Sequence, residues 1–335
     1  MRSICAIFCL ILWVGVMAQN PKRFEFSRPL MGTTFQIVLY TSDSVAAHRA
    51  AKEALDRVDT LNAIMSDYQS DSELNRLSAT AGTGTRISVS DELWTVLTQA
   101  TFFSRKTSGA FDVSIGPMSK LWRRAFRQKA FPAPEQIEHV RQLVGFRNIR
   151  LYPKTQQIKL KKKGMRLDLG GIAKGYAADQ AYQVLSQRHH ISRALVDAGG
   201  DLVLGKAPPG KKGWRIEIQV ADKEEEKKQQ LMLENCAIAT SGDTYKYLEH
   251  AGKRYSHIIH PKTGLGMTDR RQVTVICRTG MDADAWASSL SVYPIQKIST
   301  KWFSANPDHL FAQISQYADP IARVYTFGTP PYIDP

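Results

Sequence analysis

The chain has few cysteines and lacks the short motifs of several large enzyme classes. Two of its four cysteines lie in an N-terminal apolar run, which leaves Cys236 and Cys277. No Gly-x-Ser-x-Gly elbow, His-Glu-x-x-His, paired Cys-x-x-Cys or Walker phosphate loop is present, which disfavours serine hydrolases, zinc proteases and standard P-loop enzymes. A disulfide between the two remaining cysteines is allowed in an oxidising compartment, and two buried core thiols are the alternative.

Long apolar runs are also scarce: the one at the N-terminus is too short and wrongly flanked for a stable membrane span, and no further run of spanning length follows it. The first residues combine Arg2, an apolar stretch from Ile4 to Val16 and the small Ala18 before Gln19, which is the layout of a secretory signal peptide. This predicts a signal peptide over 1–18, a mature domain over 19–335 and an extracytoplasmic (periplasmic) location. An uncleaved N-terminal anchor, with peripheral attachment to the membrane, is the alternative.

Acidic residues are in the minority, with 31 Asp and Glu against 45 Lys and Arg and a formal net charge of +14. A basic chain favours anionic partners such as nucleotides, phosphates or acidic protein surfaces. The lysines at 161–163 and 206–212 have no interleaved aromatic residues and no nucleic-acid motif, so we expect no nucleic-acid partner. The sign-balanced run Asp222–Gln230 predicts an exposed loop or a helix end.

Strand-like and helical segments alternate along the chain without a regular βαβ order. The composition, 43% hydrophobic, is sufficient for a substantial core. The irregular order favours an α+β fold with mixed, largely antiparallel sheets and packed helices. Helical spacing is found at 44–65, 91–107 and from Met281, and strand patterns at 33–40, 148–152, 157–160 and in short runs between 194 and 277.

The stretch RLDLGGIAKGYAADQAYQVL, residues 166–185, places two glycines and a lysine at the start of a predicted helix. Gly170 and Gly171 allow a tight turn with exposed amides, and Lys174 lies in the first helical turn. A cation there opposes the helix dipole, and a bound phosphate or carboxylate would resolve the conflict. A glycine turn followed by a solvated lysine explains the stretch equally well.

Two further groups of polar residues are candidates for chemistry. Asp284 and Ser288 lie four residues apart on one helical face, where two oxygen donors can hold Mg²⁺, although a solvated face is the simpler reading. Asp282 is off that face and is expected to cap the helix. Strand alternation would place His257 and His260 on opposite sides, so His257 is either a lone general base or a hydrogen-bonded structural residue.

Taken in order, the motifs resemble the ApbE family, the FAD:protein FMN transferases. The resemblance runs from about Arg28 to Tyr293 and leaves a C-terminal extension over 297–335 outside it. It implies a single ApbE-like, T-fold-related domain. The segments that carry it are MGTTFQI, MSDYQSDSELNRL, GAFDVSIGPMSKLW, RLDLGGIAKGYAADQA, ALVDAGGDLVLG, AIATSGDTYKY, SHIIHPKTG and VTVICRTGMDADAWASSL.

The resemblance implies Mg²⁺-dependent transfer of FMN from FAD to a Thr or Ser hydroxyl of an acceptor flavoprotein, with release of AMP. The acceptor is expected to be a subunit of a membrane electron-transfer complex. The family's catalytic histidine matches His257, and its metal site matches the side chains of Asp284 and Ser288 with the backbone oxygen of Gly171. FAD pyrophosphatase activity and non-catalytic FAD binding are the alternatives. The implied FAD contacts are Met31, Tyr68, Ala110, Phe111, Asp112, Asp168, Lys174 and Ile258.

The chain departs from the family pattern at three places. Ser288 stands where the metal-site threonine is usual, and it keeps the hydroxyl. His260 replaces a common aspartate, which would change the charge beside the pyrophosphate. Asp197 and Asp201 stand where asparagine is frequent.

Overall fold

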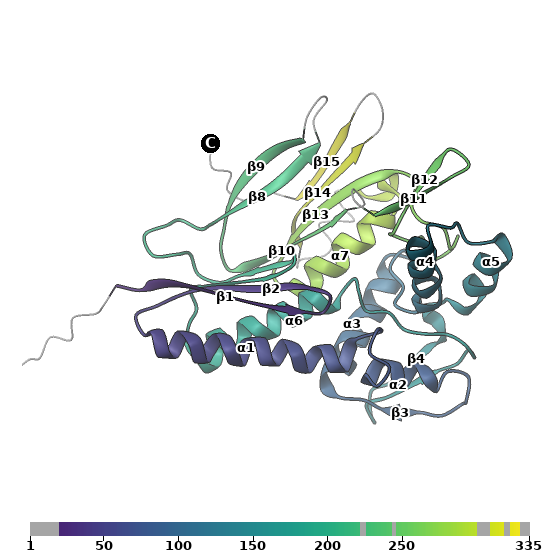
Figure 1. The fold of residues 1–335 in the computed structure, drawn as a ribbon, viewed down its shortest axis with the longest axis horizontal. Coiled ribbons are helices and arrows are strands. Elements are labelled where there is room, and N and C mark those ends of the chain that lie inside the picture. The colour runs from purple at the N-terminus through teal and green to yellow at the C-terminus, as the bar shows by residue number, and fades with distance from the viewer. Residues whose placement is uncertain (1–19, 222–225, 243–245, 300–308, 318–321, 329–335) are drawn as a thin grey trace, which may run out of the picture.

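A single eight-stranded antiparallel sheet forms the frame of the molecule (Figure 1). The computed structural model describes residues 20–221, 226–242, 246–299, 309–317 and 322–328. The strand order is β1-β2-β6-β7-β10-β13-β14-β15. The strands are β1 (Lys22–Leu30), β2 (Thr33–Thr41), β6 (Ala194–Ala198), β7 (Leu202–Leu204), β10 (Cys236–Gly242), β13 (Arg270–Cys277), β14 (His309–Tyr317) and β15 (Arg323–Gly328).

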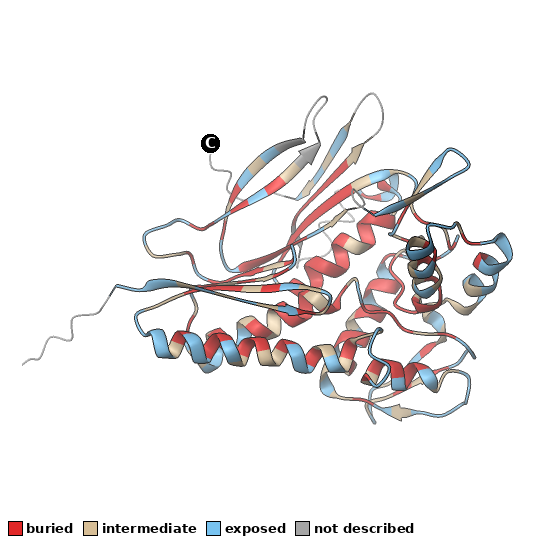
Figure 2. Cartoon of the chain, viewed as in Figure 1, coloured by how far each residue is buried: buried red, intermediate tan, exposed pale blue. Residues whose placement is uncertain are grey.

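Three helices cover one face of this sheet: α1 (Ser44–Met65), α6 (Ala173–Gln183) and α7 (Gly280–Val292). Helix α1 begins where the Asp43 side chain accepts hydrogen bonds from the amides of Val45 at 2.8 Å and Ala46 at 3.0 Å. Its apolar residues recur at helical spacing and face the sheet, so buried and exposed positions alternate along it (Figure 2). Helix α7 is almost wholly buried, which suits a helix covered on all sides.

The other face of the sheet is covered by a hairpin of β8 (Trp214–Ala221) and β9 (Glu226–Leu233). Strand residues alternate between the two faces, and β13 shows this directly: Val273 and Val275 pack toward the helices, whereas Ile276 packs with Trp214 under the hairpin. Strand β13, in the middle of the sheet, is therefore buried on both faces, whereas the edge strands β1 and β15 are more exposed.

A second group of elements packs beside the helices and carries one wall of the candidate site. It contains α2 (Glu73–Ala79), α3 (Asp91–Lys106), α4 (Gly116–Gln128), α5 (Pro134–Leu143), a small sheet of β3 (Ile87–Ser88), β4 (Ile149–Tyr152) and β5 (Gln157–Leu160), and a hairpin of β11 (Tyr247–His250) and β12 (Lys253–Ser256). Trp122 of α4 anchors the hairpin region, because its indole donates to the carbonyl of Gly264 at 2.8 Å.

The α+β prediction is confirmed, and the helices expected at 44–65, 91–107 and near Met281 are present. The segment from Lys22 to Thr41 is a two-strand hairpin rather than one strand. Helices α4 and α5 were not predicted, because their apolar faces are short and the segment between them contains Pro132 just ahead of Pro134, which opens α5. The described part of Asp222–Gln230 belongs to strand β9 and not to a loop or helix end.

Two sequence questions receive structural answers. Cys236 and Cys277 are both buried and are not joined by a disulfide, so they are core thiols in this structure. The C-terminal extension supplies β14 and β15, which continue the main sheet beyond β13. Across the described ranges, no helix has the length and apolar character needed to cross a membrane. The proposed signal peptide over 1–18 lies outside the described residues.

Candidate functional site

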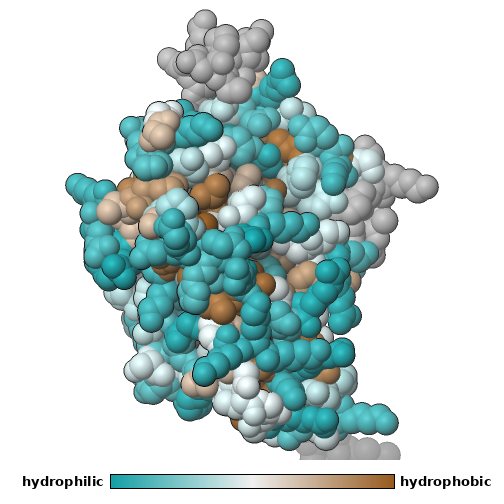
Figure 3. Space-filling view, turned by 90° about the vertical axis from the view of Figure 1, so that its right-hand side faces the viewer, coloured by the Kyte–Doolittle hydropathy of each residue, from teal (hydrophilic) through white to brown (hydrophobic). Residues whose placement is uncertain are grey.

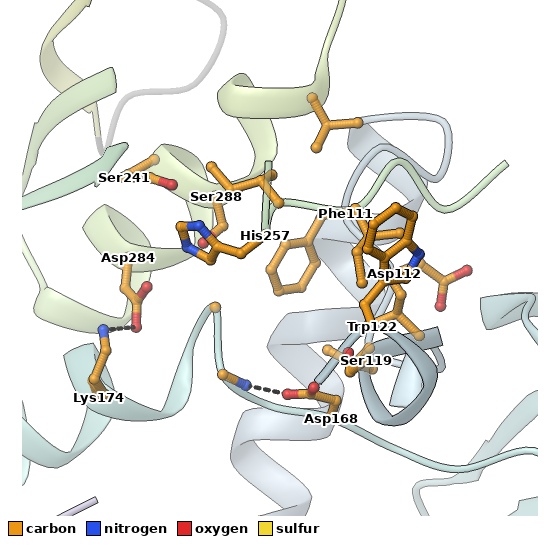
Figure 4. Close-up of a pocket in the computed structure, with 18 of the residues that line it drawn as sticks. Phe111, Asp112, Ser119, Trp122, Asp168, Lys174, Ser241, His257, Asp284 and Ser288 are labelled. Atoms are coloured by element: carbon orange, nitrogen blue, oxygen red, sulfur yellow. Dashed lines mark hydrogen bonds and ion pairs between the residues drawn. The ribbon is translucent and has the colours of Figure 1, made fainter. Parts of the chain in front are cut away.

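A pocket of about 460 Å³ opens between α4, the N-terminus of α6, the inner face of α7 and the segment after β12 (Figure 4). It brings together residues that are up to 224 positions apart in the chain, from Tyr68 to Val292. Most of the residues singled out in the sequence line it. They are Tyr68, Ala110, Phe111, Asp112, Asp168, Gly171, Lys174, His257, Ile258, Asp284 and Ser288.

Met31 is the predicted contact that does not line this pocket. It lies in the turn between β1 and β2, with φ at 51°, and packs against the main core. Thr33 of the same hairpin packs against the pocket residue Gly199, because a Cβ built on Gly199 would lie 2.0 Å from the Thr33 hydroxyl. The contact of Met31 with FAD stays a prediction.

Helices α6 and α7 cross with their backbones in contact, and this crossing builds the centre of the site. A Cβ on Gly175 would lie 2.0 Å from the carbonyl oxygen of Gly280, and a Cβ on Gly280 would lie 2.6 Å from the carbonyl oxygen of Gly175. Asp179 of α6 secures the crossing by accepting hydrogen bonds from the amides of Gly280 at 2.7 Å and Met281 at 2.9 Å. Burial raises the pKa of Asp179 to about 7 despite these two bonds.

Lys174 projects from the first turn of α6 toward two carboxylates. Their negative charges compensate for a cation at a helix N-terminus, which the helix dipole disfavours. The Lys174 ammonium group pairs directly with Asp201 and lies 3.8 Å from Asp284 Oδ2. Asp284 also accepts a hydrogen bond from the amide of Gly175 at 3.2 Å, so a protein carboxylate lies at the α6 N-terminus. Burial acts to lower the pKa of Lys174, but the two carboxylates outweigh it and raise that pKa above its usual value. Burial also raises the pKa of Asp284 to about 7, although the nearby Lys174 ammonium acts to lower it.

Gly171 and Ser288 meet on the other side of Asp284. A Cβ on Gly171 would lie 2.7 Å from the Ser288 hydroxyl and 3.3 Å from the Phe111 ring, so a side chain there would fill this space. The hydroxyls of Ser289 and Ser291 donate to carbonyl oxygens one turn back, at 2.6 and 2.8 Å. That of Ser288 makes no hydrogen bond to any residue that the structure describes, and it faces the pocket (Figure 4).

Asp282 takes part in capping α7, as expected, although the N-cap residue itself is Thr279. The amide of Asp282 donates to the Thr279 hydroxyl at 3.2 Å, and that hydroxyl donates to the Asp282 carboxylate at 2.7 Å. Its carboxylate therefore closes the first turn of α7 and does not line the pocket.

Arg123 of α4 is a pocket residue that the sequence did not reveal. Its guanidinium pairs with Asp67, donates to Asp168 Oδ2 at 2.9 Å and lies 4.1 Å from the centre of the Tyr68 ring. Tyr68 is 76% exposed, and this stacking holds an otherwise solvated ring at the pocket mouth. The signal was helical spacing, since Ser119, Trp122, Arg123 and Phe126 share one face of α4, but that helix was not predicted.

The loop from Ala110 to Asp112 forms the wall opposite Lys174. The Asp112 carboxylate is buried and accepts three hydrogen bonds, from the Ser114 amide at 2.9 Å, the Ser114 hydroxyl at 2.6 Å and the Phe146 amide at 2.8 Å. Burial raises the pKa of this carboxyl above its usual value against those bonds. Asp112 therefore shapes the loop, which leaves the backbone and the Phe111 ring to contact a ligand.

His257 follows strand β12, which ends at Ser256, so the expected strand alternation across His257 and His260 does not apply. His257 lines the same pocket as Ser288 (Figure 4), and its Nδ1 lies 3.3 Å from the carbonyl oxygen of Lys246. That contact helps to orient the ring within the pocket.

His260 does not line the pocket. Its Nδ1 accepts a hydrogen bond from the amide of Lys262 at 3.1 Å, which is the turn-forming contact an aspartate would make. Burial lowers the pKa of His260, in keeping with an unprotonated acceptor nitrogen. The replacement of the usual aspartate therefore preserves the turn and adds no positive charge to the pocket.

The face around the pocket mouth, which bears α4, α5 and the β11–β12 hairpin, is largely hydrophilic with hydrophobic side chains between the polar ones (Figure 3). Helix α4 contributes no acidic residue to it. Its exposed cations are Lys120, Arg124 and Arg127, and Lys129 follows at its end.

Comparison with known proteins gives one consistent result. A model of the ApbE family matches residues 31–311. An FAD:protein FMN transferase of Treponema pallidum is 31% identical over 89% of this chain and 88% of its own length, and one of Haemophilus influenzae is 31% identical over 84% of each. The solved flavin transferase ApbE of Vibrio cholerae superposes with a TM-score of 0.81 at 28% identity, covering 92% of this chain and 97% of that one.

Proposed function

This chain belongs to the ApbE family and is an FAD:protein FMN transferase, and from that premise we propose that the pocket binds FAD beside a magnesium ion. A Thr or Ser oxygen of the acceptor attacks the phosphorus of the FMN half of FAD. The pyrophosphate P–O bond breaks, AMP leaves with the bonding electrons, and the acceptor gains FMN through a phosphoester. The observation that carries the assignment is the convergence of Lys174, Asp284, Ser288 and His257 on one pocket.

The residues present suit a magnesium ion. Asp284, the Ser288 hydroxyl and the Gly171 carbonyl would supply hard oxygen ligands, and the uncommitted Ser288 hydroxyl supports this. No cluster of three or more His, Cys, Asp or Glu suited to a metal exists among the described residues, so phosphate and water oxygens would complete the shell. When bound, the ion would neutralise charge that develops on the pyrophosphate. Lys174 would offset the same charge from the start of α6.

The aromatic and acidic groups near the mouth would position FAD. The Tyr68 ring, held by Arg123, offers a flat face to a planar ring system of the substrate. Asp168 is fixed by Arg123 and by the amide of Gly170, which donates to its Oδ1 at 2.8 Å. Its carboxylate could accept a hydrogen bond from FAD in a fixed orientation.

His257 would take the proton of the acceptor hydroxyl. We expect His257→Ala to lower FMN transfer by about 10²- to 10⁴-fold while the affinity for FAD is largely kept, because the ring acts on the acceptor and not on FAD. Transfer would be followed by acceptor mass, and FAD affinity by flavin fluorescence. His139→Ala, an exposed histidine on α5, is the matched control. Loss of FAD binding in His257→Ala would make this residue structural.

The proposal also covers location and partner. The N-terminal apolar run favours export of the enzyme, and its acceptor would be a flavoprotein subunit of a membrane electron-transfer complex. Cell fractionation with N-terminal sequencing of the mature chain tests this. A protein recovered in the cytoplasm with Met1 intact would contradict it.

Intact mass spectrometry of a flavin-acceptor domain tests the reaction itself. Incubation with the mature enzyme, FAD and Mg²⁺ should add the mass of one FMN to the acceptor and release one AMP. Free FMN and AMP with an unmodified acceptor would indicate hydrolysis, with water in place of the protein hydroxyl. Intact FAD would indicate binding alone.

A further inference from the structure

Lys174 lies between two carboxylates and can neutralise only one of them. Asp201 comes from the segment between β6 and β7 and is 5% exposed, and Asp284 comes from α7 and is 4% exposed. The ammonium group pairs directly with Asp201, whereas its distance to Asp284 Oδ2 is 3.8 Å (Figure 4 shows the Asp284 contact). Asp201 is therefore the principal counter-ion of Lys174.

This division of partners matters because Asp284 is also the carboxylate assigned to the metal. If Lys174 paired fully with Asp284, it would neutralise the negative charge that attracts a divalent metal ion. The ammonium group and the metal ion would then compete for one carboxylate. Asp284 is held in a different way, through the Gly175 amide at 3.2 Å and the close crossing of α6 and α7. That arrangement fixes the carboxylate and leaves Lys174 only in the longer of its two ion pairs with it.

We propose that Asp201 is a positioning residue that draws Lys174 away from Asp284 and so sets the affinity of the site for Mg²⁺. Asp201 acts through Lys174 and not as a metal ligand. The inference rests on the proposed magnesium site, and it assigns a purpose to an acidic residue that the metal set itself leaves out. With Lys174 held by Asp201, the ammonium also stays at the α6 N-terminus, where it can meet a phosphate.

The isosteric change Asp201→Asn tests the proposal with metal binding as the readout. We expect the dissociation constant for Mn²⁺, measured by electron paramagnetic resonance on the metal-free enzyme, to rise about tenfold, with a parallel loss of Mg²⁺ competition. Affinity for FAD without metal should stay equal or increase, because one negative charge has left the pocket. Asp197→Asn is the matched control, since Asp197 lies at the end of β6, four residues before Asp201, and its carboxylate accepts from the amide of Gly200 at 2.7 Å and pairs with no cation among the described residues.

A double-mutant cycle with Lys174→Met distinguishes an indirect role from a direct one. If Asp201 acts through Lys174, Asp201→Asn should change Mn²⁺ affinity far less in the Lys174→Met background than in the wild type. An undiminished effect there would make Asp201 a metal ligand and overturn the proposal. Unchanged Mn²⁺ affinity in Asp201→Asn alone would overturn it as well, whatever the fold of the Lys174 variants. Failure of the proposed function would instead appear as absent FMN transfer with metal and FAD binding intact.

Discussion

Asp284→Ala is expected to lower Mg²⁺-dependent FMN transfer by at least about a thousandfold, which corresponds to about 4 kcal/mol of transition-state stabilisation. Asp284 is the only carboxylate in the proposed metal set, and the other two ligands are an uncharged hydroxyl and an uncharged carbonyl. Its removal also leaves Lys174 with a single partner, Asp201. The measurement is the initial rate of acceptor flavinylation across a Mg²⁺ titration, together with Mn²⁺ binding.

Asp282→Asn is the control for this variant, because it removes a carboxylate from the same helix two residues away. The Asp282 carboxylate accepts hydrogen bonds from the Thr279 hydroxyl at the start of α7 and from the side-chain amide of Gln99 at 2.8 Å. Its loss should therefore lower the free energy of unfolding modestly and leave the Mg²⁺ dependence of the rate unchanged. If Asp284→Ala kept the wild-type dependence of rate on Mg²⁺, the metal would have to lie elsewhere.

Gly175→Ala is expected to destabilise the enzyme by at least about 3 kcal/mol, at the upper end of what overpacking a tight contact costs. The new methyl group would lie 2.0 Å from the carbonyl oxygen of Gly280 and 2.9 Å from the Cβ of Asp284, and both belong to a buried helix that cannot yield locally. Helix α7 would have to move away from α6. Metal affinity should therefore fall together with the melting temperature, although no ligand has been changed.

Differential scanning calorimetry and Mn²⁺ binding measure the two halves of that prediction. Gln183→Ala, an exposed change in the same helix, should alter neither quantity appreciably. An alanine at position 175 that left stability and metal affinity intact would show that the two helices do not need their close crossing.

Local patterns in the sequence were sufficient for the elements with long, regular periodicity. The apolar spacing from Ser44 to Met65 predicted α1 with its observed bounds, because one continuous face of that helix packs on the sheet. Helix α4 was missed, since it is short, opens with Gly116 and Pro117, and is rich in arginine. Arg123 was missed with it, because its partners Asp67 and Asp168 are distant in sequence and meet only in the folded chain.

The candidate site divides in the same way. Spacing on one helix face placed Asp284 beside Ser288, and the glycines before α6 correctly marked an unusual helix start. What the sequence could not give were the contacts between segments: the pairing of Lys174 with Asp201, and the strand end at Ser256 that frees His257 from a strand register. The Lys174–Asp201 pairing depends on how α6 and the segment between β6 and β7 approach one another in three dimensions.

The position of β1 has a consequence for how the enzyme reaches a large partner. Strand β1 enters from one end of the long axis, while α4 and the β11–β12 hairpin, which flank the pocket mouth, lie toward the other (Figure 1). Any attachment ahead of Lys22 would therefore use the body of the protein as a spacer between the anchor point and the mouth. An acceptor would then be modified at about that distance from the attachment point. The length of the segment ahead of Lys22 would set how far from that point the pocket can reach.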